Sequence, residues 1–191
     1  MTSNDIIQAL ARVAGADGGQ FEAVDSRDGM PTVVVPRELL PDAARALRDD
    51  PALRFAFLAD IVAVDYFPRE PRYELVYLLV SLGTSGFGET PRRLRLKVRV
   101  PNDDAIVPTV SNIWPAANWV ERETFDLYGV RFDGHPDLRR ILMPDDWEGH
   151  PMRKDYPVQI KAPVKTYAPL QLSEEEFVAN VEAARVRPRE D

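Results

Sequence analysis

The two histidines of the chain stand in identical Gly-His-Pro triplets, centred on His135 and His150, and arginine or lysine follows each triplet. Neutral imidazole beside carboxylates can bind a transition metal. A structural interpretation competes, because glycine permits a turn, proline prevents helix continuation and imidazole can satisfy backbone groups at such a corner. A closed metal site needs three or four convergent protein ligands. The pattern therefore favours the structural interpretation and leaves a metal-dependent hydrolase as an alternative. The nearby carboxylates are those of Asp133, Asp137, Glu148 and Asp155.

A second candidate for chemistry is the acidic group Glu121, Glu123 and Asp126, since paired carboxylates with separated pKa values perform acid–base catalysis in hydrolases. On a helix, however, Glu121 and Glu123 are two positions apart and point to different sides. The sequence shows no Ser/His/Asp or Cys/His arrangement and no phosphate-binding glycine loop between a strand and a helix. We therefore expect no independent catalytic site in this chain.

Basic and apolar residues alternate from Arg92 to Val100, which predicts a strand with one apolar and one cationic face. The cationic face is the best argument for an RNA-binding or adaptor domain. Platforms for single-stranded RNA also need aromatic residues on the same face, and this face has none. A net charge of −7 repels phosphate backbones, so we expect no nucleic acid partner. The cationic residues are Arg93, Arg95, Lys97 and Arg99.

The composition excludes several classes of protein. The 191 residues include no cysteine, which excludes disulfides and the usual iron–sulfur ligation by thiolates of this chain. No stretch approaches the roughly 20 apolar residues that span a bilayer, and the segment from Met1 to Asp5 lacks the basic region of a signal peptide. We therefore expect the chain to stay where it is made.

Residues 1–110 have the pattern of one α+β core domain. We predict a mostly antiparallel sheet with helices on one face, because each expected strand and helix has one apolar side. Asp28-Gly29 is a strong hairpin signal between two strand-like runs. The expected elements are a helix from Ser3 or Asn4 to Gly15, strands at Phe21–Ser26 and Met30–Val35, a helix burying Leu40, Ala43, Ala44 and Leu47, strands at Ile61–Phe67, Tyr73–Leu82 and Arg92–Val100, and a hairpin loop at Gly83–Gly88.

The pattern changes after this core. Residues 111–129 predict a helix that begins near Ile113, carries the Glu-Arg-Glu motif and ends at Gly129. Residues 130–172 alternate glycine, proline and charge with single large apolar residues, which predicts an extended arm with little regular hydrogen bonding of its own. Residues 173–191 predict a short helix and a tail, with Ser173 and Glu176 forming a capping box.

The arm has the composition of a binding segment. Its apolar residues lack the periodicity needed to build a core, so they need a surface to lie on. Arginine together with tryptophan or tyrosine is enriched at the hot spots of protein interfaces. The sequence therefore predicts that the arm wraps a partner protein.

Four ordered motifs carry a family resemblance. They run from Trp114 to Glu123, from Asp126 to Gly129, from Gly134 to Leu142 and from Glu148 to Pro157. Together they resemble the signature of the C subunit of proton-pumping NADH:quinone oxidoreductase, respiratory complex I.

The resemblance implies a scaffold subunit of the peripheral arm of complex I, which couples electron transfer from NADH to a quinone such as ubiquinone with proton translocation. It implies no cofactor in this chain, with iron–sulfur clusters and FMN in partner subunits. The main partner would be the D subunit, which resembles the hydrogenase large subunit and lines the quinone cavity. The chain would be peripheral to the bacterial cell membrane, on the cytoplasmic side, through the complex alone. The equivalent subunit of a membrane-bound hydrogenase or another donor:quinone complex stays an alternative.

The motif residues are the predicted partner interface. Among them we expect Arg139→Ala or Arg153→Ala to lower assembly of the complex before altering the fold of the isolated subunit. The full set is Trp119, Glu121, Arg122, Glu123, Asp126, His135, Pro136, Arg139, Arg140, Trp147, His150, Pro151, Arg153, Lys154, Asp155 and Tyr156.

Overall fold

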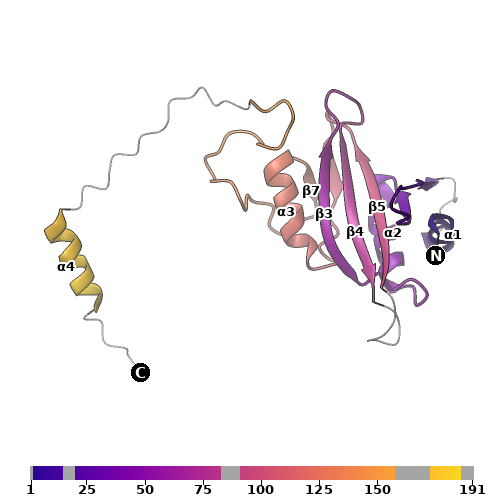
Figure 1. Ribbon diagram of the computed structural model, residues 1–191, viewed down its shortest axis with the longest axis horizontal. Helices are drawn as coiled ribbons and strands as arrows, with labels where there is room; N and C mark the ends of the chain where they lie inside the picture. The colour runs from indigo at the N-terminus through magenta and orange to yellow at the C-terminus, as the bar shows by residue number, and fades with distance from the viewer. Residues whose placement is uncertain (1, 15–19, 83–90, 158–172, 186–191) are drawn as a thin grey trace. The chain divides into compact units, whose positions relative to one another are not determined.

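The computed structural model describes residues 2–14, 20–82, 91–157 and 173–185 (Figure 1). The chain divides into two compact units, Met1–Tyr156 and Pro157–Asp191. The first unit joins the segments expected as a core domain, a motif helix and the start of an arm. The loop expected at Gly83–Gly88 and the arm from residue 158 to 172 lie outside the described residues. No helix of the described part is long and apolar enough to cross a membrane.

A five-stranded sheet with the order β1-β2-β5-β4-β3 is the frame of the first unit. β3 (Phe57–Asp65), β4 (Tyr73–Ser81) and β5 (Arg92–Val100) form the antiparallel meander that the alternation predicts, although β3 begins four residues earlier than expected. β1 (Glu22–Ala23) and β2 (Thr32–Val34) form the predicted hairpin, and β2 pairs in parallel with β5. The sheet is therefore mostly antiparallel, as predicted.

One face of this sheet carries the hydrophobic core. Every second residue of β5, from Leu94 to Val100, is fully buried. α1 (Ser3–Ala14) and α2 (Leu40–Asp49), the latter preceded by a short 3-10 turn at Arg37–Leu39, add their apolar residues to the same cluster. The α2 residues Leu40, Ala43, Ala44 and Leu47 are buried as predicted, so the helices cover one face.

The opposite face carries the predicted row of cations, and three of them pair with carboxylates of the same chain. Arg95 lies 2.7 Å from Asp28, and Lys97 lies 2.7 Å from Glu74. Arg99 contacts Glu22 at 2.8 Å. Because these charges are largely neutralised within the chain, the face is a weak anion-binding surface.

A second, two-stranded sheet was not expected from the sequence. β6 (Ile106–Pro108) pairs in parallel with β7 (Arg131–Asp133), and Val107 and Phe132 of these strands are buried in the core. The pairing corrects the expectation that the chain after Gly129 has little regular hydrogen bonding. Since β7 directly follows α3 (Ala117–Tyr128), it brings the beginning of the arm back onto the core.

α3 begins at Ala117 rather than near Ile113 and ends at Gly129 as predicted. Trp114, expected in the helix, lies in the turn before it, where its ring is buried and its Nε1–H donates to the carbonyl oxygen of Phe55 at 3.0 Å. α3 packs along the edge strand β3, as Figure 1 shows.

The second unit contains α4 (Glu174–Arg185). Its capping box has both predicted bonds: the Ser173 hydroxyl accepts from the Glu176 amide at 3.2 Å, and the Glu176 carboxylate accepts from the Ser173 amide at 3.0 Å. Phe177 and Val178 are exposed on this helix.

Candidate functional site

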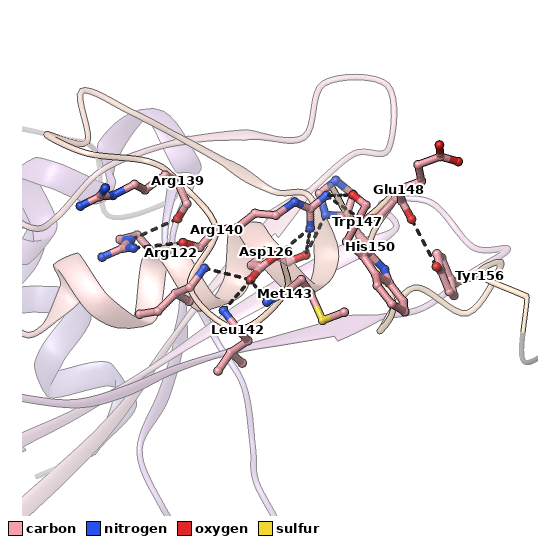
Figure 2. A network of polar contacts seen from close by, with 12 residues as sticks. Arg122, Asp126, Arg139, Arg140, Leu142, Met143, Trp147, Glu148, His150 and Tyr156 are labelled. Carbon is pink, nitrogen blue, oxygen red and sulfur yellow. Dashed lines mark hydrogen bonds and ion pairs between the residues drawn. The ribbon is translucent and has the colours of Figure 1, made fainter. Parts of the chain in front are cut away.

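The buried carboxylate of Asp126, inside α3, gathers the first part of the arm. Its Oδ2 accepts the consecutive backbone N–H groups of Ile141, Leu142 and Met143 at 3.0, 2.8 and 2.8 Å. Its Oδ1 accepts from the guanidinium of Arg140 at 2.6 Å (Figure 2). Burial alone would raise the pKa of Asp126, but these four donors outweigh burial and lower it. Asp126 is therefore a carboxylate bound to its own chain.

Arg140 closes the following residues into a loop. Besides Asp126, its guanidinium donates to the carbonyl oxygens of Trp147 at 3.0 Å and Gly149 at 2.9 Å. The planar fork of arginine suits this role because it directs several N–H groups in fixed directions. The side chain of Arg140 thus binds the far end of residues 140–149 and closes this segment, which we call the Arg140 loop.

The second Gly-His-Pro triplet caps the C-terminus of α3. The last carbonyl groups of a helix lack partners within the helix. Here His150 Nδ1 lies 2.9 Å from the carbonyl oxygen of Asp126, the Met152 amide donates to Leu127 at 3.0 Å, and Arg153 Nε donates to Tyr128 at 2.6 Å. Because a carbonyl oxygen only accepts, His150 Nδ1 carries the proton. Burial, with Arg153 and Arg140 nearby, lowers the pKa of His150, which favours the neutral imidazole.

Gly129 is required where the arm meets the helix end. Its φ of 77° lies in the left-handed region that favours glycine, and its amide donates to the Phe125 carbonyl oxygen at 2.8 Å. A Cβ at this position would lie 2.3 Å from Arg153 Nη2 and 2.5 Å from His150 Cδ2. The glycine therefore allows the two capping side chains to approach the backbone.

The first Gly-His-Pro triplet contacts the opposite end of α3. His135 Nε2 lies 3.1 Å from the carbonyl oxygen of Asn118, and Nδ1 accepts the Asp137 amide at 3.0 Å. One nitrogen therefore donates and the other accepts, which is the pattern of a neutral imidazole. Both histidines satisfy backbone groups at corners, as the structural interpretation predicted.

Glu121 is fully buried behind this corner. Its carboxylate accepts the Val110 amide at 2.8 Å and the Thr109 hydroxyl at 2.5 Å, and thereby ties the segment after β6 to α3. His135 Nε2 is 3.9 Å away, but its proton is engaged by Asn118. Burial raises the pKa of Glu121 to about 7 against these hydrogen bonds.

The buried ion pair of Arg72 and Asp65 fastens the last described part of the arm to the sheet. Arg72 donates to Asp65 at 2.9 and 3.0 Å and to Asp155 of the arm at 2.6 and 3.0 Å. Asp65 also accepts the backbone amide of Lys154 at 2.9 Å. Burial disfavours the Asp65 charge, yet the bonds from Arg72 and two amides lower its pKa overall. Charge-assisted bonds thus connect the end of β3, through Arg72, to Lys154 and Asp155.

The structure brings most predicted interface residues together in contacts within the chain. The remaining ones face outward: Trp119, Glu123, Pro136 and Arg139 are exposed. Their role at a partner stays a prediction. The Tyr156 hydroxyl donates to the Glu148 carbonyl oxygen at 3.2 Å. Arg122, Trp147 and Pro151 are half-buried, whereas Lys154 and Asp155 are exposed although each makes a bond inside the chain. The residues with such internal bonds are Glu121, Asp126, His135, Arg140, His150, Arg153, Lys154 through its backbone, Asp155 and Tyr156.

Sequence reasoning did not single out Asp65, Arg72 or Thr109 as partners of the motif residues. Asp65 and Arg72 left a signal, because Asp65 is the last residue of β3 and Arg72 directly precedes β4, so the two opposite charges stand at neighbouring strand ends. Thr109 left none, since its role depends on a contact with Glu121 across the fold.

The described residues include no cluster of three or more histidine, cysteine or acidic side chains that could hold a metal ion. His135 and His150 bond to backbone carbonyls at opposite ends of α3, so they do not converge. This arrangement disfavours the hydrolase alternative for the described part of the chain.

Known proteins share both the motifs and the fold. The family described as "Respiratory-chain NADH dehydrogenase, 30 Kd subunit" matches residues 33–162. The C subunit of NADH-quinone oxidoreductase from Roseiflexus sp. (strain RS-1) is 52% identical over 127 residues, which cover 66% of this chain and 70% of the relative. The C subunit of the same enzyme from Geobacter sulfurreducens (strain ATCC 51573 / DSM 12127 / PCA) is 50% identical over 132 residues, covering 69% and 76%.

Two solved structures are also similar to this chain. The trypsin-resistant fragment (1-134) of Nqo5 is 37% identical, covers 72% of this chain and 100% of the fragment, and superposes with a TM-score of 0.55. A polypeptide of the membrane-bound sulfane sulfur reductase, an archaeal respiratory membrane complex, is 26% identical, covers 98% and 94%, and has a TM-score of 0.64. From the motifs, the fold and these matches, the chain belongs to the family of the 30 kDa subunit of respiratory-chain NADH dehydrogenase, which is the C subunit of complex I.

Proposed function

We propose that this chain is a structural subunit of a NADH-quinone oxidoreductase and holds neighbouring subunits in position for electron transfer to quinone and proton translocation. The observation that supports this role most directly is the arm. Asp126 of α3 accepts backbone amides of the arm, Arg140 bonds to carbonyl oxygens within the arm, and His150 and Arg153 of the arm bind the carbonyl end of α3. These contacts give the described part of the arm a fixed conformation. Such a segment acts through geometry, by fixing where its exposed side chains stand.

The proposed main partner is the D subunit, the component that resembles the hydrogenase large subunit. In this proposal the iron–sulfur clusters and FMN belong to partner subunits, and the chain contributes neither a cofactor nor a catalytic residue. The absence of cysteine from the sequence supports the assignment of the clusters to other chains. Electrons would then pass through neighbours that this subunit keeps at a fixed separation.

We also propose that the chain reaches the membrane through the complex and faces the cytoplasm. Binding to a membrane-embedded complex requires only a protein interface, and the acidic net charge of −7 disfavours direct attraction to anionic lipid.

Co-purification from native membranes tests this function. The chain, tagged at its C-terminus and expressed at its natural level, is expected to bring down the D subunit and to carry NADH:quinone activity after mild detergent extraction. The same eluate identifies the electron donor, because each donor is oxidised by its own subunits. Recovery of the tagged chain without any other oxidoreductase component would contradict the proposal.

A further inference from the structure

Four residues beside the Asp126 network form a surface that we call the Trp119 patch: Trp119, Arg139 and Leu142, which are exposed, and Arg122, which is half-buried. Trp119 is 60% exposed and Leu142 is 59% exposed. The side chain of Arg139 is 73% exposed. Figure 2 shows Leu142 directed away from Asp126. Tryptophan and arginine, which make up three of these four residues, are enriched at interface hot spots.

The backbone under the patch is fixed in place. The Arg122 guanidinium lies 5.5 Å from the Trp119 ring centroid and donates to the carbonyl oxygens of Arg139 and Arg140 at 3.1 Å each. The amide of Leu142 is held by Asp126 at 2.8 Å. A surface that is already ordered loses little conformational freedom on association, which favours binding.

The charges of the patch indicate what it fits. Arg122 is met by carbonyl oxygens and a tryptophan ring, and no carboxylate pairs with it among the described residues. Arg139 has one exposed partner, Asp137, at 2.9 Å. Two guanidinium groups therefore stand beside exposed apolar side chains, and carboxylates of a partner could engage both.

The outer sheet face is the main competing surface, and its charges argue against it. It also exposes an apolar residue, Phe57, at 53%. Three of its cations, however, are paired with Asp28, Glu74 and Glu22. A partner there would have to displace three existing ion pairs, whereas at the Trp119 patch the only ion pair among the described residues is the exposed one between Arg139 and Asp137.

We infer that the Trp119 patch is a docking surface, and that its occupant is an apolar surface edged with carboxylates on another subunit of the same complex. This inference rests on the proposed function and deepens it. Trp119 and Leu142 supply the apolar contact, Arg139 supplies the charge, and Arg122 holds the backbone that presents them.

Competition inside the cell tests the patch. Each tagged variant is co-expressed with the untagged wild-type chain, the complex is isolated through a tag on another of its subunits, and mass spectrometry gives the ratio of the two chains. Trp119→Ala and Leu142→Ala are expected to be at least tenfold under-represented. Phe57→Ala, which removes a similarly exposed aromatic from the outer sheet face, is the matched control and is expected at the wild-type level.

Charge is tested with a second pair. Arg139→Glu is expected to be excluded from the complex, and Arg139→Lys is expected to be retained, because only the lysine variant can still meet a carboxylate. The thermal unfolding of each purified variant is expected to match that of the wild type, since these side chains are exposed.

The outcomes separate the two proposals. If wild-type chain is present in the complex and the Trp119, Leu142 and Arg139→Glu variants compete equally with it, the docking inference is wrong and the proposed function stands. If the wild-type chain is absent from the complex, the proposed function is wrong and the inference falls with it.

Discussion

At the scale of single residues, the carboxylate of Asp126 accepts from four donors at once, three backbone amides and one guanidinium. A buried donor without an acceptor costs its full desolvation free energy. This cost is larger than the net free energy that a satisfied hydrogen bond contributes to stability. Substitution of one such acceptor should therefore affect stability more than substitution of an exposed charge on the same helix.

Asp126→Asn is expected to lower the free energy of unfolding by about 2–4 kcal/mol, because Arg140 loses its counter-charge and the amide group of asparagine cannot replace both oxygens. Denaturant unfolding of the purified subunit measures this. Glu123→Gln, at an exposed position of α3, is the control and is expected to stay within about 0.5 kcal/mol. Equal stability of the two variants would contradict the assigned role of Asp126.

Gly29 and Gly129 both have a left-handed φ, so alanine variants at the two positions separate the effect of backbone strain from that of steric crowding. At Gly29, with φ of 69°, an added Cβ would have no atom within 4 Å, whereas at Gly129 it would meet His150 and Arg153. Gly29→Ala is expected to lower stability by about 1–2 kcal/mol from strain alone. Gly129→Ala is expected to lose about 2–5 kcal/mol, since overpacking is added to strain. Urea unfolding compares them, and similar losses would show that the capping side chains move aside freely.

Glu121 predicts a pH dependence with a defined sign. Burial raises its pKa from 4.5 to about 7, so the protonated form is favoured in the folded state, and its stabilising contribution is lost as pH rises from about 4.5 to about 7. Glu121→Gln removes this titration. The stability of the glutamine variant relative to wild type is therefore expected to rise by about 3 kcal/mol across that window.

Unfolding measured from pH 4.5 to 8 in both proteins checks this prediction. His150 has a lowered pKa and acts in the opposite direction, because its contribution is lost as pH falls below its ordinary value. It is present in both proteins and cancels in the difference. A difference independent of pH would show that Glu121 titrates in the folded protein as it does in the unfolded chain.

At the scale of elements, α3 and the arm complete each other. The arm supplies partners for the carbonyl groups at the end of α3, and α3 supplies Asp126 to order the arm. Neither segment has all of its polar groups satisfied alone. We therefore expect the last turn of α3 and the second Gly-His-Pro corner to open together.

His150→Phe tests this coupling, because phenylalanine keeps a ring but lacks the Nδ1–H donor. We expect a loss of about 1–2 kcal/mol and faster amide exchange at Gly129 and Met152, whose hydrogen bonds lie in the cap. Exchange in α2, which is remote from the cap in the sequence, serves as the internal reference and is expected to be unchanged. Faster exchange at Met152 alone would contradict opening as one unit.

The same elements show what could be predicted from the sequence. β5 was predicted with its observed bounds because alternation over nine residues has one interpretation. β6 and β7 span three residues each, too short for a period, and their pairing joins segments distant in the chain. The arm was expected to need a foreign surface because its apolar residues lack periodicity. Its inner partner, the end of α3, is made of backbone carbonyls, which no side-chain pattern displays.

At the scale of the whole molecule, the boundary between the two units follows Tyr156. The bonds of Asp155 to Arg72 and of Lys154 to Asp65 end the series that holds the arm on the first unit. Removing residues 158–191 should therefore leave the first unit with its full set of these bonds.

A chain ending at Pro157, which keeps the Arg140 loop and the α3 cap, is the reference. A chain ending at Asp137, which retains β7 but loses the Arg140 loop and the α3 cap, is the comparison and is expected to be much less stable. Thermal and urea unfolding of the two chains check this. Equal stability of the chains ending at Pro157 and at Asp137 would contradict the stabilising role assigned to the loop and the cap.

The closure of the Arg140 loop by a single side chain has a kinetic consequence. If the loop became ordered only on binding, a folding step would limit the rate of complex formation. Here the ordering takes place when the subunit folds, because Arg140 and Asp126 belong to the same chain as the loop. Encounter with a partner is then governed by diffusion and orientation, in the range of about 10⁵–10⁷ M⁻¹ s⁻¹. The rate should scale with partner concentration and show no lag.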